Sequence, residues 1–242
     1  MNVRLTPLIV CSLLLGWLSA GCVTEPPPIV IHEEPNSSIW LMFDPEAGRP
    51  GHNHPATFTP EQMALVLKGV VVVDRNRVIG EARELFAHDQ EGTQAFSAAQ
   101  IKVLAPLLAQ AFNKASPVDL VTFYLLTGEK ERGKVVTSGG MFVRQRRLYV
   151  ILANFRTSPA TKTYETTYEL EARDMPLLPV ARFLYLVGFK PKEAWIPNGE
   201  VRGKDGYERY LDESKLIIID VDRLFAGGSS PSQERTGRAD GR

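Results

Sequence analysis

The chain has 242 residues, 44% of them hydrophobic and 23% charged, and its 28 Lys and Arg residues balance 28 Asp and Glu residues. This composition is typical of a globular protein and excludes a chain that is disordered throughout. A formal net charge of zero gives no electrostatic basis for binding nucleic acid, so we expect no nucleic-acid partner.

The first 21 residues have the three parts of a cleavable signal peptide. Arg4 supplies a positive charge, a mostly apolar run covers residues 8–18, and three small residues cover 19–21. An apolar helix over residues 8–18 would be about 16 Å long, whereas a bilayer core is about 30 Å thick. A transmembrane helix is therefore disfavoured, and we predict that residues 1–21 are removed.

The segment LSAGC at residues 18–22 resembles a bacterial lipobox. Ser19 departs from the leucine that is usual at its position. The resemblance implies that Cys22 is acylated, becomes the new N-terminus and anchors the chain in membrane lipid. Val23 follows in place of aspartate, which is similar to lipoproteins sorted to the outer membrane, facing the periplasm. The alternative is an ordinary secretory signal that precedes a cysteine by chance.

Cysteine and proline positions then divide the chain. Cys11 would leave with the leader, so we expect no disulfide within the mature chain. Residues 22–38 contain Cys22 and four prolines and are expected to form an extended tether that reaches roughly 50 Å. We expect residues 39–225 to form a single domain, and residues 226–242, which contain no large apolar side chain, to form a disordered tail.

Capping boxes mark two helix starts. Thr59 and Ser97 each precede a glutamine by three residues and are flanked by the apolar pair of a hydrophobic staple. We expect helices to begin there. Because Pro106 removes a backbone hydrogen bond from the second helix, we also expect a kink or break near residues 103–105. A weaker third helix is expected around residues 79–86.

β-branched and aromatic residues dominate the chain after Pro117. The polar links between three such runs are short enough for antiparallel hairpins. Helices that precede strands favour an α+β fold over regular alternation. We predict an antiparallel β-sheet, a meander, with two or three helices packed on one face. The predicted strands cover residues 120–126, 135–143 and 148–155, with further candidates at 163–171, 183–187 and 216–220.

Two segments suggest chemistry that their context does not support. Residues 128–135 match a phosphate-binding loop up to Val135, which replaces the hydroxyl that would hold magnesium. We therefore predict a charged hairpin turn, with no nucleotide and no other cofactor. His52 and His54 lie near Asp44 and Glu46 and could supply ligands to a metal, but we expect a solvated loop and no metal site. No catalytic residue is assigned.

Two features are candidates for binding a partner. One is a predicted hairpin tip at which arginines could meet anionic lipid headgroups, an acidic protein or an envelope polymer. The other is a segment rich in aromatic residues, which resembles the composition of interface cores. The plain alternatives are a solvated turn and a buried strand. The residues concerned are Arg144, Arg146 and Arg147 at the tip, and Phe183, Tyr185, Phe189 and Trp195 in the aromatic segment.

These observations favour a membrane-anchored cell-envelope lipoprotein that is a noncatalytic binding module for another envelope component, a protein or a polymer. One alternative is an envelope hydrolase or metal-dependent enzyme that uses His52, His54 and nearby carboxylates. The other is a structural surface protein without a discrete site.

Overall fold

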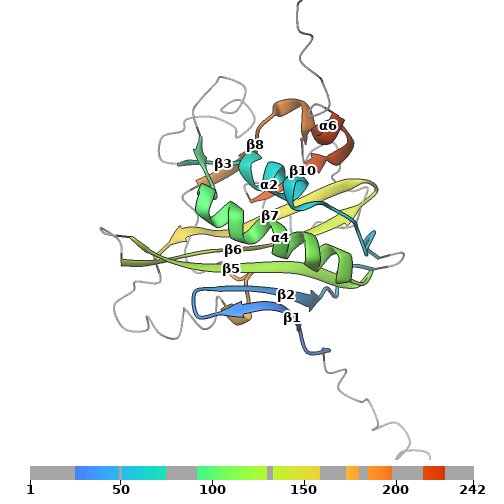
Figure 1. Ribbon diagram of the computed structural model, residues 1–242, viewed down its shortest axis with the longest axis horizontal. Helices are drawn as coiled ribbons and strands as arrows, with labels where there is room; N and C mark the ends of the chain where they lie inside the picture. Colours follow the sequence, from blue (N-terminus) through green and yellow to red (C-terminus); the bar gives the residue numbers. More distant parts are fainter. Residues whose placement is uncertain are drawn as a thin grey trace, which may run out of the picture.

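The computed structural model describes residues 25–48, 51–74, 92–129, 133–158, 173–179, 185–197 and 215–226. Within these ranges the chain forms an antiparallel seven-stranded sheet, a smaller three-stranded sheet and α-helices, as predicted for an α+β fold (Figure 1). The helices are α2 (Pro60–Gly69), α4 (Ala98–Lys114) and α6 (Val221–Ala226). The strands are β1 (Ile29–Glu34), β2 (Ser37–Phe43), β3 (Val70–Asp74), β4 (Thr93–Gln94), β5 (Asp119–Glu129), β6 (Gly133–Arg144), β7 (Arg147–Thr157), β8 (Tyr185–Phe189), β9 (Trp195–Ile196) and β10 (Leu216–Asp220).

Both predicted helix starts are confirmed. The Thr59 hydroxyl accepts a hydrogen bond from the Gln62 amide at 3.2 Å, and the Gln62 side chain accepts one from the Thr59 amide at 2.9 Å. Ser97 and Gln100 repeat this reciprocal pair at the start of α4. Each pair satisfies backbone donors that have no partner within the helix.

Pro106 does not break α4, which is continuous from Ala98 to Lys114. Pro106 is exposed, and so is Lys102, whose carbonyl would have accepted the missing hydrogen bond. The lost bond therefore lies on the solvent side, where water can satisfy the carbonyl. The opposite face of α4 is buried, and this burial stabilises the helix against the cost of the proline.

The predicted meander is confirmed by strands β5, β6 and β7, which pair in sequence as antiparallel neighbours. The complete order of the large sheet is β1-β2-β5-β6-β7-β10-β9. The segment at 128–135 joins β5 to β6, and Glu129 is paired with Gly133. It therefore forms a hairpin connection, as predicted, and not the strand-to-helix turn of a phosphate-binding loop.

The chain enters the sheet earlier than predicted. Residues up to 38 were expected to form the tether, but Ile29–Glu34 is a strand that pairs with β2, from Ile29 opposite Leu41 to Glu34 opposite Ser37. The β-branched run Ile29-Val30-Ile31 favours a strand, and the short link between the two strands forms a hairpin. The link between Cys22 and the sheet thus shrinks to residues 23–28.

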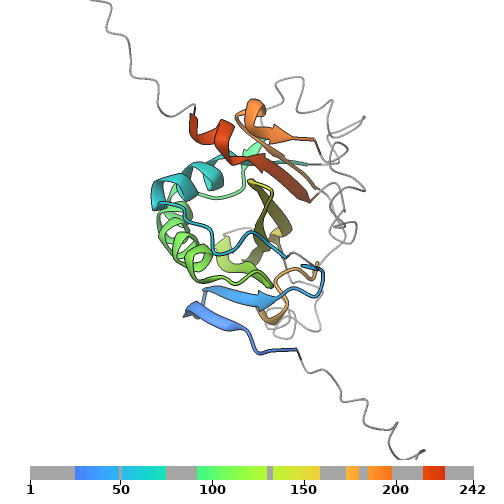
Figure 2. The ribbon, with the colours of Figure 1, turned by 90° about the vertical axis from the view of Figure 1, so that its right-hand side faces the viewer.

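The central strands of the large sheet, β5, β6 and β7, are buried on both faces. Helices α2 and α4 cover one face, and Figures 1 and 2 show them as a layer beside the curved sheet. Alternate residues of β5, such as Val121 and Phe123, join the main core with these helices and the small sheet. On the opposite face a second cluster forms, and Leu177 from residues 173–179 packs against it. Its members are Leu120, Phe142, Tyr149, Ile151, Ile196, Leu216 and Ile218.

A buried polar network holds residues 173–179 on this second face. The Ser138 hydroxyl donates to the Pro176 carbonyl at 2.7 Å, and the Asn154 amide group donates to Ser138 and to the Leu178 carbonyl, each at 2.9 Å. Ser138 and Asn154 are almost fully buried and are paired across β6 and β7. The network therefore supplies a partner to the carbonyl of the buried Pro176 and joins the exposed Leu178 to the sheet.

The remaining sequence predictions fall partly within the described residues. The strand predicted at 216–220 is β10, and the one predicted at 183–187 overlaps β8 at residues 185–187, with 183 and 184 outside the described residues. The predicted strand at 163–171, the third helix at 79–86 and residues 227–242 of the predicted tail lie outside the described residues.

Gly139 provides a test of the packing between β6 and β7. The strand register shifts between Ser138 and Gly139, and a Cβ atom at Gly139 would collide with the Ile151 carbonyl. We expect Gly139→Ala to lower the free energy of unfolding by about 1–3 kcal/mol, because the backbone of β7 would have to move. Urea unfolding followed by circular dichroism measures this.

The matched control is Gly128→Ala in β5, where a Cβ atom would meet nothing within 4 Å. This substitution should leave stability unchanged or slightly raised, since alanine reduces the entropy of the unfolded chain. Equal effects at both positions would contradict the argument from close backbone approach.

Candidate functional site

One end of the large sheet concentrates the features that sequence analysis identified. Because neighbouring strands are antiparallel, β1 begins, β2 ends, β5 begins and the β6–β7 hairpin turns at this same end. The chain also enters the fold here, through residues 25–28. We call this region the tether end of the sheet. It carries a buried cluster of Asp44, His52 and His54, an arginine hairpin tip, and exposed apolar side chains.

Asp44 and His52 form the centre of the buried cluster. Asp44 directly follows β2, and its Oδ2 atom lies 2.8 Å from Nε2 of His52. Its Oδ1 atom accepts a hydrogen bond from the Glu46 amide at 2.9 Å. Both side chains of the pair have no solvent-exposed area. The carboxylate therefore fixes the turn after β2 and the imidazole at the same time.

His54 is held in its neutral form. Its Nε2 atom accepts a hydrogen bond from the Val143 amide at 3.1 Å, so the proton of the neutral ring resides on Nδ1. Burial, together with the neighbouring His52, lowers the pKa of His54 from its ordinary value of 6.5 to about 4. The Ser116 carbonyl and Asp119 oppose this shift only in part. Nδ1 is buried without a hydrogen bond of good geometry.

Residues 51–56 wrap around the tether end and contact both faces of the sheet. On the second face, the ring centroids of His52 and Phe142 lie 4.5 Å apart. On the helix side, His54 packs edge-to-face against Phe112 of α4, with ring centroids 5.4 Å apart. Backbone hydrogen bonds fasten the same segment. They join His52 N to Pro117 O at 2.8 Å, Asn53 N to Val143 O at 2.7 Å and Ala56 N to Phe112 O at 3.0 Å.

The prediction of a solvated histidine loop is therefore wrong. His52 is 3% and His54 is 6% exposed, because the glycine- and proline-rich stretch folds back over the sheet end. In the parts of the chain that the structure describes, no three His, Cys, Asp or Glu side chains gather around a common point that could hold a metal. His52 and His54 do lie together, but their bonds go to Asp44 and to the backbone of β6.

The arginine tip is a two-residue hairpin turn. Gln145 and Arg146 both have positive φ, 49° and 60°, as a tight turn between right-twisted strands requires. The Gln145 amide donates to Asn53 Oδ1 at 2.6 Å, which joins the tip to residues 51–56. Arg144 and Arg147 flank the turn, are paired with each other in the register and are half-buried.

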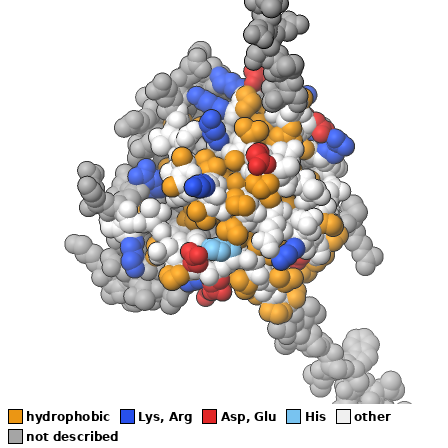
Figure 3. Space-filling model, in the orientation of Figure 1, with side chains coloured by type: hydrophobic (Ala, Val, Ile, Leu, Met, Phe, Trp, Pro, Cys, Tyr) orange, Lys and Arg blue, Asp and Glu red, His pale blue; other side chains and the backbone are white. Residues whose placement is uncertain are grey.

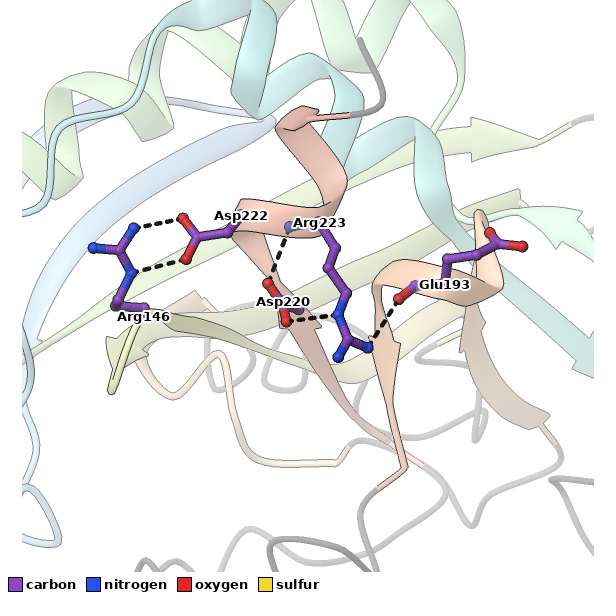
Figure 4. Close-up of polar contacts among 5 residues, drawn as sticks. All are labelled: Arg146, Glu193, Asp220, Asp222 and Arg223. Atoms are coloured by element: carbon purple, nitrogen blue, oxygen red, sulfur yellow. Dashed lines mark hydrogen bonds and ion pairs between the residues drawn. The ribbon is translucent and has the colours of Figure 1, made fainter. Parts of the chain in front are cut away.

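Arg146 is committed to a contact within the chain. Its guanidinium binds both carboxylate oxygens of Asp222 in α6, at 2.8 and 2.7 Å (Figure 4). The hydrogen bonds between the two groups lower the pKa of Asp222 and raise the pKa of Arg146. Both side chains remain largely exposed, so water and salt weaken the attraction. The three predicted arginines are thus brought together, and Arg146 also anchors α6 to the tip.

The aromatic segment is placed mainly in the core. Tyr185 and Phe189 of β8 are buried, and the Tyr185 hydroxyl lies 2.9 Å from the carbonyls of Leu152 and Ala153. Trp195 is half-buried against the core. Phe183 lies outside the described residues. Tyr185 and Phe189 therefore serve packing, and all five residues of β8 are buried, as in a strand covered on both faces.

Sequence reasoning missed the exposed apolar side chains, which include Met175 and Leu178 of residues 173–179 and two further groups. The first lies at the tether end and consists of Ile29, Val30, Phe43 and Val118, which are 55%, 52%, 36% and 42% exposed. The second lies on the outer face of the helix layer. Leu65 of α2 is 44% exposed and Val103 of α4 is 50% exposed. Figure 3 shows hydrophobic side chains gathered over this layer. The second group could have been expected from the sequence, because α4 contains few charged residues to cover its outer face.

Comparisons of the chain with protein-family models, with curated proteins and with solved structures found no match. In the described part of the chain, none of the helices has both the length and the apolar composition needed to cross a membrane.

The buried His54 predicts how stability depends on pH. The pKa of His54 is lower in the folded protein, so between about pH 6.5 and 4 the unfolded chain binds a proton that the folded chain does not. Folding stability should therefore fall as the pH drops through this window. A shift of this size corresponds to roughly 3 kcal/mol at most.

The test is urea unfolding at pH 7, 5.5 and 4 for the wild type and for His54→Gln. Glutamine can still accept the bond from the Val143 amide but cannot titrate, so the variant should lose much of the pH dependence. His32→Gln, at a half-buried position of β1, removes a histidine outside the cluster and serves as the control. If His54→Gln retained the full pH dependence, the assignment to His54 would be wrong.

Proposed function

We propose that this chain is a lipid-anchored lipoprotein of the bacterial cell envelope, placed on the outer membrane and facing the periplasm. The observation that carries the proposal is the leader that ends in a lipobox-like segment at Cys22, seven positions before the first strand at Ile29. This spacing leaves room for an acylated cysteine and a short link, with no further element between the lipid and the sheet.

We further propose that the α+β domain is a noncatalytic binding module. In support, the buried polar side chains have structural roles in the described residues. Asp44 and His52 fasten the turn after β2, and Ser138 and Asn154 hold residues 173–179 on the sheet. Groups that bind backbone in this way stabilise the fold and are not free to take protons from a substrate.

The outer face of α2 and α4 is the surface we assign to a partner, another protein of the envelope. Leu65 and Val103 are large, apolar and about half exposed, and Ala99 and Pro106 of α4 are exposed beside them. Such side chains are typical of the core of a protein interface when a polar border surrounds them. Lys68 and Lys102 are exposed on the same two helices and supply charges for such a border.

Lipid attachment is tested by expressing the full chain in a bacterium that processes lipoproteins, with labelled palmitate in the medium. We expect label on the wild type, and a mass spectrum that begins at an acylated Cys22. Cys22→Ser should abolish both. Cys11→Ser is the control, because Cys11 lies in the leader and should be removed with it. An unmodified Cys22, or a leader that stays attached, would exclude the proposal.

The partner surface is tested by photo-crosslinking in intact cells. A photoreactive amino acid at Leu65 or at Val103 should yield an adduct with the same envelope protein, because both side chains lie on one face. The control is Met175, which is also 50% exposed but belongs to residues 173–179 beneath the opposite face. An identical adduct from Met175, or adducts from neither helix, would contradict this assignment.

A further inference from the structure

The short link to the lipid limits how far the start of β1 can lie from the bilayer. Seven residue steps separate Cys22 from Ile29, and a fully extended chain spans at most about 25 Å over that length. A domain of this size is roughly 40 Å across. The lipid attachment proposed above therefore keeps one side of the domain close to the bilayer, and the side nearest the anchor is the tether end.

The surface at the tether end is apolar where the chain enters. Ile29 and Val30 begin β1, Phe43 ends β2, and Val118 precedes β5, and all four side chains are exposed. We call these four residues the apolar rim. Antiparallel pairing places them at one edge of the molecule and not at scattered positions. Exposed apolar side chains that gather at one place on a domain are typical of a surface that contacts a protein or a membrane.

The apolar rim is held in place by the bonds described above. The Asp44 amide donates to the Val118 carbonyl at 2.8 Å, which fixes the end of β2 beside the start of β5. His52 connects the same two chain segments a second time, because its side chain bonds to Asp44 and its backbone amide donates to the Pro117 carbonyl. A surface that is already ordered loses little conformational entropy when it binds.

Cationic side chains lie beside the apolar rim. The register that pairs Val121 with Met141 brings Arg144 level with Val118, and Arg147 follows on the next strand. Arginine donates hydrogen bonds to phosphate groups, and apolar residues next to such cations are typical of surfaces that rest in the headgroup region of a bilayer.

We propose that the apolar rim is a membrane-contact surface that rests in the interface of the bilayer holding the lipid anchor. This proposal depends on acylation of Cys22 and adds the orientation of the domain. Ile29, Val30, Phe43 and Val118 contact the region between headgroups and acyl chains, and Arg144 and Arg147 lie at the level of the phosphates. The outer face of α2 and α4 stays in water.

The test uses the full processed protein in phosphatidylcholine vesicles, with spin labels attached to single introduced cysteines. An acylated Cys22 leaves no other thiol in the mature chain, so each label has one site. Val30→Cys and Val118→Cys report on the apolar rim, and Leu65→Cys and Val103→Cys are controls of similar exposure on the helix layer. Circular dichroism establishes that each variant is folded.

We expect the ratio of oxygen accessibility to nickel-chelate accessibility to be several-fold higher at positions 30 and 118 than at 65 and 103. Four water-exposed labels on a chain whose Cys22 is acylated would overturn the membrane contact and leave the lipid anchor intact. Labels at 65 and 103 that are deeper in the bilayer would also overturn it. A mass spectrum without acyl groups on Cys22 would instead remove the anchor on which the proposal rests.

Discussion

The buried hydrogen bond between Asp44 and His52 is the contact on which the tether end of the sheet depends. Asp44 follows β2, and His52 lies in the segment that crosses both faces of the sheet, so one 2.8 Å contact connects two parts of the chain. Because both side chains are closed off from solvent, removing either partner deprives a buried polar or charged group of a hydrogen bond, which is costly. The neighbouring bonds from Asp44 N to Val118 and from His52 N to Pro117 then keep the outer residues in position.

Burial, and not distance, determines how strongly each polar contact stabilises this fold. Arg146 and Asp222 approach to 2.7 Å, closer than Asp44 and His52, and make two bonds instead of one. Yet their side chains are 79% and 56% exposed, so water competes for both groups. We infer that the exposed pair orients α6 against the hairpin tip, whereas the buried pair sets the path of the chain.

Features encoded by neighbouring residues could be predicted from the sequence. The capping boxes at Thr59 and Ser97 and the hairpins of β5, β6 and β7 depend on side chains a few positions apart, and both were correct. The burial of His52 and His54 could not be predicted in this way, because Phe142 and Phe112 cover them from distant parts of the chain. Prolines before β1 likewise suggested a tether, although pairing with β2 outweighs that local preference at Ile29–Glu34.

The two exposed apolar groups gain a common explanation from the direction of the strands. Helix α4 runs along the sheet and ends at Lys114, just before Val118, so its C-terminal end lies at the tether end (Figure 1). If the domain stands on this end, as proposed, the outer face of α2 and α4 lies at its side, away from the lipid. One apolar surface would then face the bilayer, while the other stays open to a protein in the surrounding compartment. With the proposed anchor at Cys22, a longer link would let the tether end move away from the bilayer, whereas the few residues before Ile29 would keep it close.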